Sequence, residues 1–169
     1  MGTVSRELHP DEAKYGSAAF PQFTKNNGTN GPVSWLAYDA AATETAYWEV
    51  TAFSYGSGNI TVDLIWGAAT ATSGVVRWEV AIAAITPEAD SQDPETKAYA
   101  TAVAVDDTHL GTTAKRLHRA TVSLSGASLD SIAALDEVWV RIARLGAHAN
   151  DTLAGDAWLK KAVLSYSDI

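Results

Sequence analysis

The sequence predicts an all-β protein, an antiparallel two-sheet sandwich of jelly-roll-like type with about eight strands and an extended N-terminal arm. Apolar and polar residues alternate strictly in four segments, which is typical of strands with one buried face. Gly, Ser, Asn and Asp cluster between these segments as turn signals. No segment offers the helices that connect parallel strands. We therefore predict an arm over residues 1–32 and a β-sandwich domain over residues 33–169.

The first 32 residues differ from the rest in carrying three prolines, Asn-Gly turn dipeptides and no sustained periodicity. Two interpretations are open, an arm docked on a neighbour and a disordered tail. The aromatic side chains of Phe20 and Phe23 favour the docked arm, because tails rarely keep aromatic residues that they do not bury. Phe20 and Phe23 are therefore candidate interface residues.

Strands are predicted most strongly over residues 46–52, 59–67, 74–85 and 137–145, and more weakly over 33–38, 99–105, 117–124 and 158–166. The residues that share the apolar phase of these strands form the predicted core. They are Trp48, Val50, Ile60, Val62, Leu64, Trp66, Val76, Trp78, Val80, Val138, Val140 and Ile142.

Trp139 is out of phase with its apolar neighbours Val138 and Val140, which places it on the opposite face of its strand, together with Arg141. An exposed Trp is typical of an interface or of a surface that stacks on sugars. The alternative is that the arm or a long loop covers this face. Trp139 is the third candidate interface residue.

Two connecting segments contain further signals. Residues 128–135 are the one stretch with helical character, sufficient for a turn or two. The connection from Thr86 to Thr96 is acidic and contains two prolines, which favours a solvated loop over a contact loop.

Charge and composition exclude several partners. The formal net charge is −8 and no long basic run occurs, so a nucleic-acid partner is not expected. No apolar stretch approaches the length of a membrane span and the first residues do not resemble a signal peptide, so we expect no membrane partner. The absence of Cys removes disulfides, thiolate metal sites and Cys nucleophiles.

Neither catalytic residues, nor a cofactor, nor a metal site is predicted. The histidines His9, His109, His118 and His148 lie in four separate segments and are expected to face solvent. Glu49 and Glu79 are expected to form cross-strand charge pairs and not the carboxyl pair of a glycosidase. Asp151 and Asp156 leave open a weak calcium site, but a turn stabilised by local hydrogen bonds is favoured.

Three segments carry a resemblance to a known group of proteins: residues 58–66, residues 73–80 and residues 150–159. Together they resemble small β-sandwich structural proteins of tailed-bacteriophage virions, over roughly residues 33–165. Proteins of this type are similar in fold to capsid decoration proteins, head fibres and tail adhesins.

This resemblance implies a non-enzymatic virion structural protein. The first expectation is a capsid decoration (cement) protein at the capsid surface, with the major capsid protein as its partner and a homo-oligomeric state, a trimer being favoured. The alternative is a receptor-binding or fibre-tip adhesin domain that recognises host surface glycans. Another virion role and an enzyme are the remaining readings, the enzyme last because no catalytic motif is present.

Overall fold

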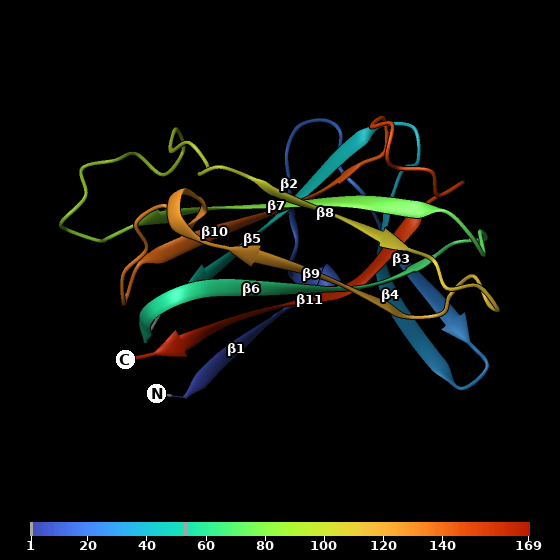
Figure 1. Cartoon of the computed structure of the whole chain (residues 1–169), viewed down its shortest axis with the longest axis horizontal. Helices are drawn as coiled ribbons and strands as arrows, with labels where there is room; N and C mark the ends of the chain where they lie inside the picture. The colour runs from blue at the N-terminus through green and yellow to red at the C-terminus, as the bar shows by residue number, and fades with distance from the viewer. Residues whose placement is uncertain (1, 53) are drawn as a thin grey trace.

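In the computed structural model, which describes residues 2–52 and 54–169, two antiparallel β-sheets pack face to face (Figure 1). This described part of the chain contains eleven strands and two short 3-10 helices. The predicted all-β class and the two-sheet sandwich are therefore confirmed, with more strands than the eight expected.

Sheet A has the strand order β3-β4-β11-β6-β9, and β1 pairs with β11 beside this path. Its strands are β1 (Thr3–Leu8), β3 (Gln22–Gly28), β4 (Gly31–Tyr38), β6 (Tyr55–Ala68), β9 (His118–Leu124) and β11 (Ala157–Asp168). Strand β11 pairs with β6 on one side; on the other side its beginning pairs with β4 and the remainder pairs with β1.

Sheet B has the order β2-β5-β10-β7-β8. Its strands are β2 (Lys14–Tyr15), β5 (Thr43–Thr51), β7 (Val75–Ile85), β8 (Val103–Thr108) and β10 (Glu137–Leu145). Strand β10 pairs with β5 and β7 without a register shift, so that Val140 lies opposite both Trp48 and Ile82. Because side chains alternate between the two faces of a strand, this register fixes which residues of β5, β7 and β10 point outward.

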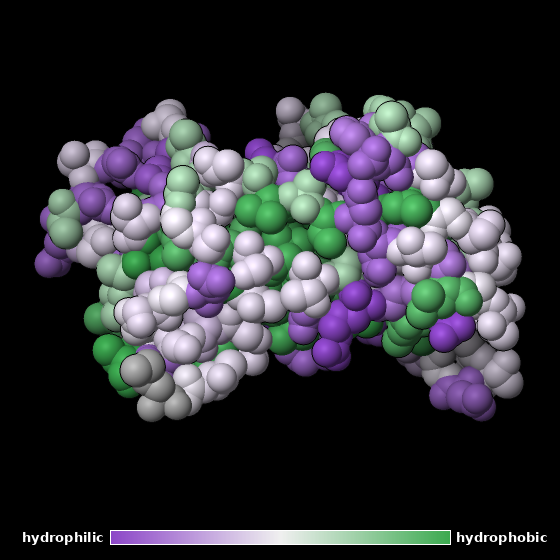
Figure 2. Space-filling model, in the orientation of Figure 1, coloured by the Kyte–Doolittle hydropathy of each residue, from purple (hydrophilic) through white to green (hydrophobic). Residues whose placement is uncertain are grey.

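The core between the sheets contains the predicted tryptophans Trp48, Trp66 and Trp78, each at most 1% exposed. Trp78 makes edge contacts with Tyr38 and with Trp66, at ring-centroid distances of 5.1 and 6.4 Å. The other predicted core residues are buried too, except that Val50 is partly buried against the core. Apolar residues also reach the surface along the edge between β8 and β9 (Figure 2).

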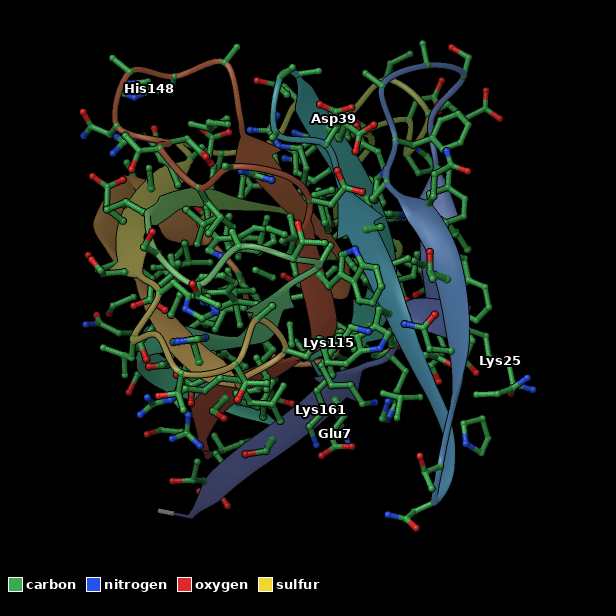
Figure 3. All side chains as sticks on the ribbon, turned by 90° about the vertical axis from the view of Figure 1, so that its right-hand side faces the viewer. Glu7, Lys25, Asp39, Lys115, His148 and Lys161 are labelled. Atoms are coloured by element: carbon green, nitrogen blue, oxygen red, sulfur yellow. The ribbon has the colours of Figure 1, made fainter. Side chains whose placement is uncertain are left out.

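The structure corrects the predicted N-terminal arm. Residues 1–32 were expected to lie outside the sandwich, but β1 pairs with β11, β2 with β5 and β3 with β4. Glu7 of β1 and Lys161 of β11 lie side by side and form an ion pair (Figure 3). These strands escaped the period-two criterion because they lie at sheet edges, where both faces of a strand are partly exposed.

The connections are irregular, with 3-10 turns at Pro10–Glu12 and Gly126–Leu129. The second turn is shorter and begins earlier than the helix expected over residues 128–135. The long connection between β7 and β8 projects from one end of the sandwich (Figure 1). Among the described residues no helix is long and apolar enough to cross a membrane.

Candidate functional site

The outer face of sheet B presents three partly exposed aromatic residues, Tyr47, Tyr99 and Trp139, which we call the aromatic platform. Tyr47 and Trp139 point outward because their strand neighbours Ala46, Trp48, Val138 and Val140 point into the core. Trp139 lies on β10 opposite Glu49, and Tyr47 lies on β5 opposite Arg141, so both rings are carried by paired strands.

Tyr99 reaches the platform from the connection before β8. The next residue, Ala100, donates its N–H to the carbonyl of Ile82 on β7 (2.9 Å), which holds this segment beside the sheet. The Tyr99 ring lies 5.9 Å from the Tyr47 ring, and the guanidinium of Arg141 lies 5.4 Å from the Tyr99 ring. Partial burial raises the pKa of the Tyr99 phenol to about 12.

Ion pairs fix the polar groups around the platform. Glu49 binds the ammonium of Lys14 and also accepts a hydrogen bond from Nε1 of Trp139 (3.2 Å). The bond from Lys14 holds the pKa of the Glu49 carboxyl below its usual range. Arg141 donates to Glu79 across the strands (2.8 Å). The expected charge pairing of Glu49 and Glu79 on this face is thereby confirmed.

The platform suits a ligand that has flat apolar faces and a polar rim. Its three rings come from three different segments. Tyr47 and Tyr99 contact each other, Arg141 lies over Tyr99, and Glu49 accepts the indole N–H of Trp139, so part of the side-chain freedom is already lost before binding. The carboxylates and cations beside the rings supply hydrogen-bond acceptors and donors. Such a combination of aromatic area and fixed polar groups is typical of a binding surface.

Of the three residues predicted as interface candidates, only Trp139 belongs to the platform. Phe20 packs against Tyr15 at 5.5 Å, and Phe23 is 47% exposed on edge strand β3. Phe23 and Tyr15 line a separate cleft with Pro10. The interface roles of all three candidates stay predictions.

Sequence reasoning missed Tyr47 and Tyr99. Tyr47 carries the same signal as Trp139, since it alternates with Ala46 and Trp48, and that signal was available. Tyr99 follows a long connection, and no local pattern indicates that its ring lies over the sheet.

Two of the four histidines are buried, which corrects the expectation that all four face solvent. His109 and His118 are 5% and 6% exposed, with ring centroids 4.4 Å apart, and His118 stacks on Trp66. Nε2 of His118 accepts the N–H of Leu110 (2.9 Å), so the neutral ring carries its proton on Nδ1. His118 is buried because it occupies an inward position of β9, and the ring of His109 packs beside it.

Both carboxylate oxygens of Asp151 already accept hydrogen bonds from other residues of the protein. Its two oxygens accept hydrogen bonds from Arg144 at 3.0 and 2.8 Å, and one of them also accepts the N–H of Arg77. Burial, more than any other influence, raises the pKa of Asp156. Within the described residues, no three His, Cys, Asp or Glu side chains are grouped so that they could hold a metal ion. Asp151 therefore serves as the partner of Arg144 and Arg77 in this segment.

Comparison with known proteins adds information on the fold. No protein-family model and no curated protein matches the chain. Among solved structures, the chain is similar to CBM35 from Cellvibrio japonicus Abf62, with a TM-score of 0.51 and 12% identity over 98% of this chain and 99% of that one. The xylan-binding module CBM15 follows with a TM-score of 0.49 and 13% identity over 99% of both chains. A carbohydrate-binding module specific for non-crystalline cellulose, CBM28, has a TM-score of 0.49 and 10% identity over 92% and 89%. At such identities the likeness to CBM35 establishes the fold alone.

Proposed function

We propose that this protein is a non-catalytic binding module that holds carbohydrate chains on the aromatic platform of sheet B. The observation that carries the proposal is the joint presence of Tyr47, Tyr99 and Trp139 on one outer sheet face, each partly exposed and each beside a charged side chain. A sugar ring has the matching form, because one face presents C–H groups and the rim presents hydroxyls.

The shared fold supports the same reading. CBM35, which this chain resembles over nearly the full length of both, is a carbohydrate-binding module by name. The three structures named above are such modules and not virion proteins. They favour the glycan-recognition alternative over capsid decoration. A capsid partner, a virion location and a trimeric state stay predictions.

Charge pairing on this face favours uncharged glycans. Lys14 is paired with Glu49 and Arg141 with Glu79, so each positive charge is already balanced by a carboxylate, and the donors that remain suit hydroxyl groups better than the carboxylate of an acidic sugar. An incoming anion would also approach two carboxylates in a protein whose formal net charge is −8.

Binding to soluble polysaccharides tests the proposal. The neutral polysaccharides to test in affinity gels are xylan, hydroxyethyl cellulose, mannan and mixed-linked β-glucan. We expect at least one of these four to retard the protein, whereas polygalacturonate should not. Trp139→Ala should weaken the binding about tenfold or more, because truncating an aromatic hot spot costs about 2 kcal/mol or more and about 1.4 kcal/mol corresponds to tenfold.

Phe23→Ala is the matched control, because it removes an aromatic side chain that is also exposed but lies on edge strand β3 of sheet A. It should leave the affinity unchanged. If Phe23→Ala loses binding and Trp139→Ala does not, the binding site is the cleft lined by Pro10, Tyr15 and Phe23. Absence of binding to all four neutral polysaccharides would refute the proposed function.

A further inference from the structure

A polar hollow lies under the connection between β7 and β8. It has a volume of about 430 Å³ and is lined by Gln92, Asp93, Lys97, Tyr99 and Asp130 among others. A second hollow of about 270 Å³ shares Gln92, Lys97 and Asp130 with it. Together they have the size of a small-molecule site, for which several hundred Å³ is usual.

The lysine in this hollow is held in place. Only 13% of the Lys97 side chain is exposed, and its ammonium lies 3.0 Å from the Asp130 carboxylate, of which 18% is exposed. Asp130 also accepts the backbone N–H of Ala84 (2.7 Å), so this carboxylate is anchored to β7. The ammonium has three donors and one of them faces Asp130, which leaves two for another partner.

Local hydrogen bonds shape the connection beside the hollow. Thr86 and Asp90 exchange hydrogen bonds of 2.9 Å, one from Thr86 N to the Asp90 carboxylate and one from Asp90 N to the Thr86 carbonyl. Asp93 accepts the N–H of Glu95 (2.9 Å) through one oxygen. These hydrogen bonds are local to the connection, and residues 87–96 are exposed, as its composition predicted for a solvated loop.

Tyr99 joins this hollow to the aromatic platform. Its side chain lines the hollow, while its ring also contacts Tyr47 and the Arg141 guanidinium on the outer face of sheet B. The platform and the hollow are therefore adjacent, with Tyr99 common to both.

The chemistry of the lining indicates the kind of group that it accepts. Two carboxylates disfavour an anion, and the fixed ammonium of Lys97 disfavours an amine. Donors and acceptors stand beside one another in Lys97, Gln92 and Asp93, which matches hydroxyl groups that donate and accept at once. We propose that this hollow is a second subsite, which binds one uncharged sugar unit at the end of a glycan whose other units lie on the platform. The inference rests on the proposed function, because the platform supplies the remainder of the binding surface.

Chemical-shift mapping with xylohexaose, cellohexaose and mannohexaose tests it. With at least one of them, we expect backbone amide shifts at Trp139 and Arg141 for the platform, and at Lys97, Ala98 and Tyr99 for the hollow. Gln92→Ala and Lys97→Met should each remove the shifts of the hollow, retain those of the platform and weaken binding of the hexaose about five- to tenfold. Because Gln92 is exposed, we expect Gln92→Ala to fold normally, so it tests the subsite even where Lys97→Met disturbs the fold. Lys25→Met is the matched control, since Lys25 lies on β3 and points away from the molecule (Figure 3).

The outcomes separate the two proposals. Shifts confined to the platform, or a hexaose affinity unchanged in Gln92→Ala and Lys97→Met, would overturn the subsite and leave the proposed function intact. Shifts confined to the hollow would support a sugar site there and overturn the role of the platform. An absence of shifts in both places with all three hexaoses would overturn both.

Discussion

Arg144 is a charged side chain with no exposed surface, and it organises the connection between β10 and β11. All five of its N–H donors have partners. They are the two oxygens of Asp151 and the carbonyls of Tyr38, Leu153 and Gly155, the last sharing one nitrogen with Tyr38. Arg144 thus holds together different parts of this connection and attaches it to the end of β4. Asp151 neutralises the buried charge of Arg144.

Replacing this arginine by an apolar side chain of similar length tests its role. Arg144→Met should lower the free energy of unfolding by about 3 to 5 kcal/mol, because it leaves the buried Asp151 carboxylate and three carbonyls without their partner. Urea denaturation followed by tryptophan fluorescence measures the change. Arg119→Met is the control, since Arg119 is 67% exposed and 3.9 Å from Asp63, and its loss should cost well under about 1 kcal/mol. Equal stabilities of the two variants would contradict the role given to Arg144.

At the same residue scale, the sequence predicted the orientation of side chains on strands better than their roles. The phase of Trp139 placed it correctly on an outer face, and the phases of Trp66 and Trp78 placed them in the core. Arg144 belongs to the inward phase of β10, but alternation alone does not reveal the five acceptors that make such a position tolerable. Asp151, Leu153 and Gly155 follow Arg144 within 11 residues, but they lie in an irregular connection without periodicity, and Tyr38 is 106 residues away.

At the scale of elements, the connection between β8 and β9 depends on two histidines. Nδ1 of His109 accepts the N–H of Gly111 (3.0 Å), and its Nε2 pairs with the Ala114 carbonyl (2.9 Å). His118 accepts the N–H of Leu110, and Trp66 covers its ring. Each bond to a ring nitrogen that acts as an acceptor requires a neutral ring.

Stability should therefore fall as the pH drops below the ordinary histidine pKa. Burial first, and then the nearby His109, lowers the pKa of His118 below 6.5. Asp107 raises this pKa, and Arg116 lowers it through its charge but raises it through a backbone hydrogen bond. The unfolded chain takes up a proton before the folded one does, so the stabilisation is complete above about pH 7 and is lost as the pH falls through 6.5 towards the lower folded pKa.

Urea midpoints measured between pH 8 and pH 5.5 check this prediction. The wild-type midpoint should decrease over this range, whereas the decrease should be smaller in His118→Gln, which keeps an acceptor for Leu110 but does not titrate. Parallel pH profiles for the two proteins would show that His118 does not contribute.

The strands themselves were predictable to different degrees, for a physical reason. The central strands β5, β6, β7 and β10 bury most positions of their inward face, so apolar residues recur at every second position over most of each strand. Strand β1 places Arg6 among its inward positions, and β2 has only two residues. At the edge of a sheet fewer neighbours demand apolar side chains, and the alternation that identifies a strand is weakened.

At the scale of the whole molecule, the N-terminal segment closes one side of the sandwich. Six residues of β1 pair with β11, from Thr3 opposite Ser167 to Leu8 opposite Ala162. Leu8 is 1% exposed within the core, and the carbonyl of His9 accepts the indole N–H of buried Trp48 (2.8 Å). The beginning and the end of the described chain therefore stabilise each other, side by side in sheet A (Figure 1).

A chain truncated to begin at Pro10 should for this reason be less stable by about 3 kcal/mol or more. Loss of the buried Leu8 side chain alone removes about 1.5 to 3 kcal/mol. The indole N–H of Trp48, left without an acceptor, adds about 1 to 3 kcal/mol if it remains buried. The urea midpoint, read by circular dichroism, measures the loss. Replacing Thr3 by Ala in the intact chain is the control, because this side chain is exposed and the pairing of β1 is retained. A docked arm that makes no contribution to folding would give the opposite result, with the truncated chain unfolding at the same urea concentration as the intact one.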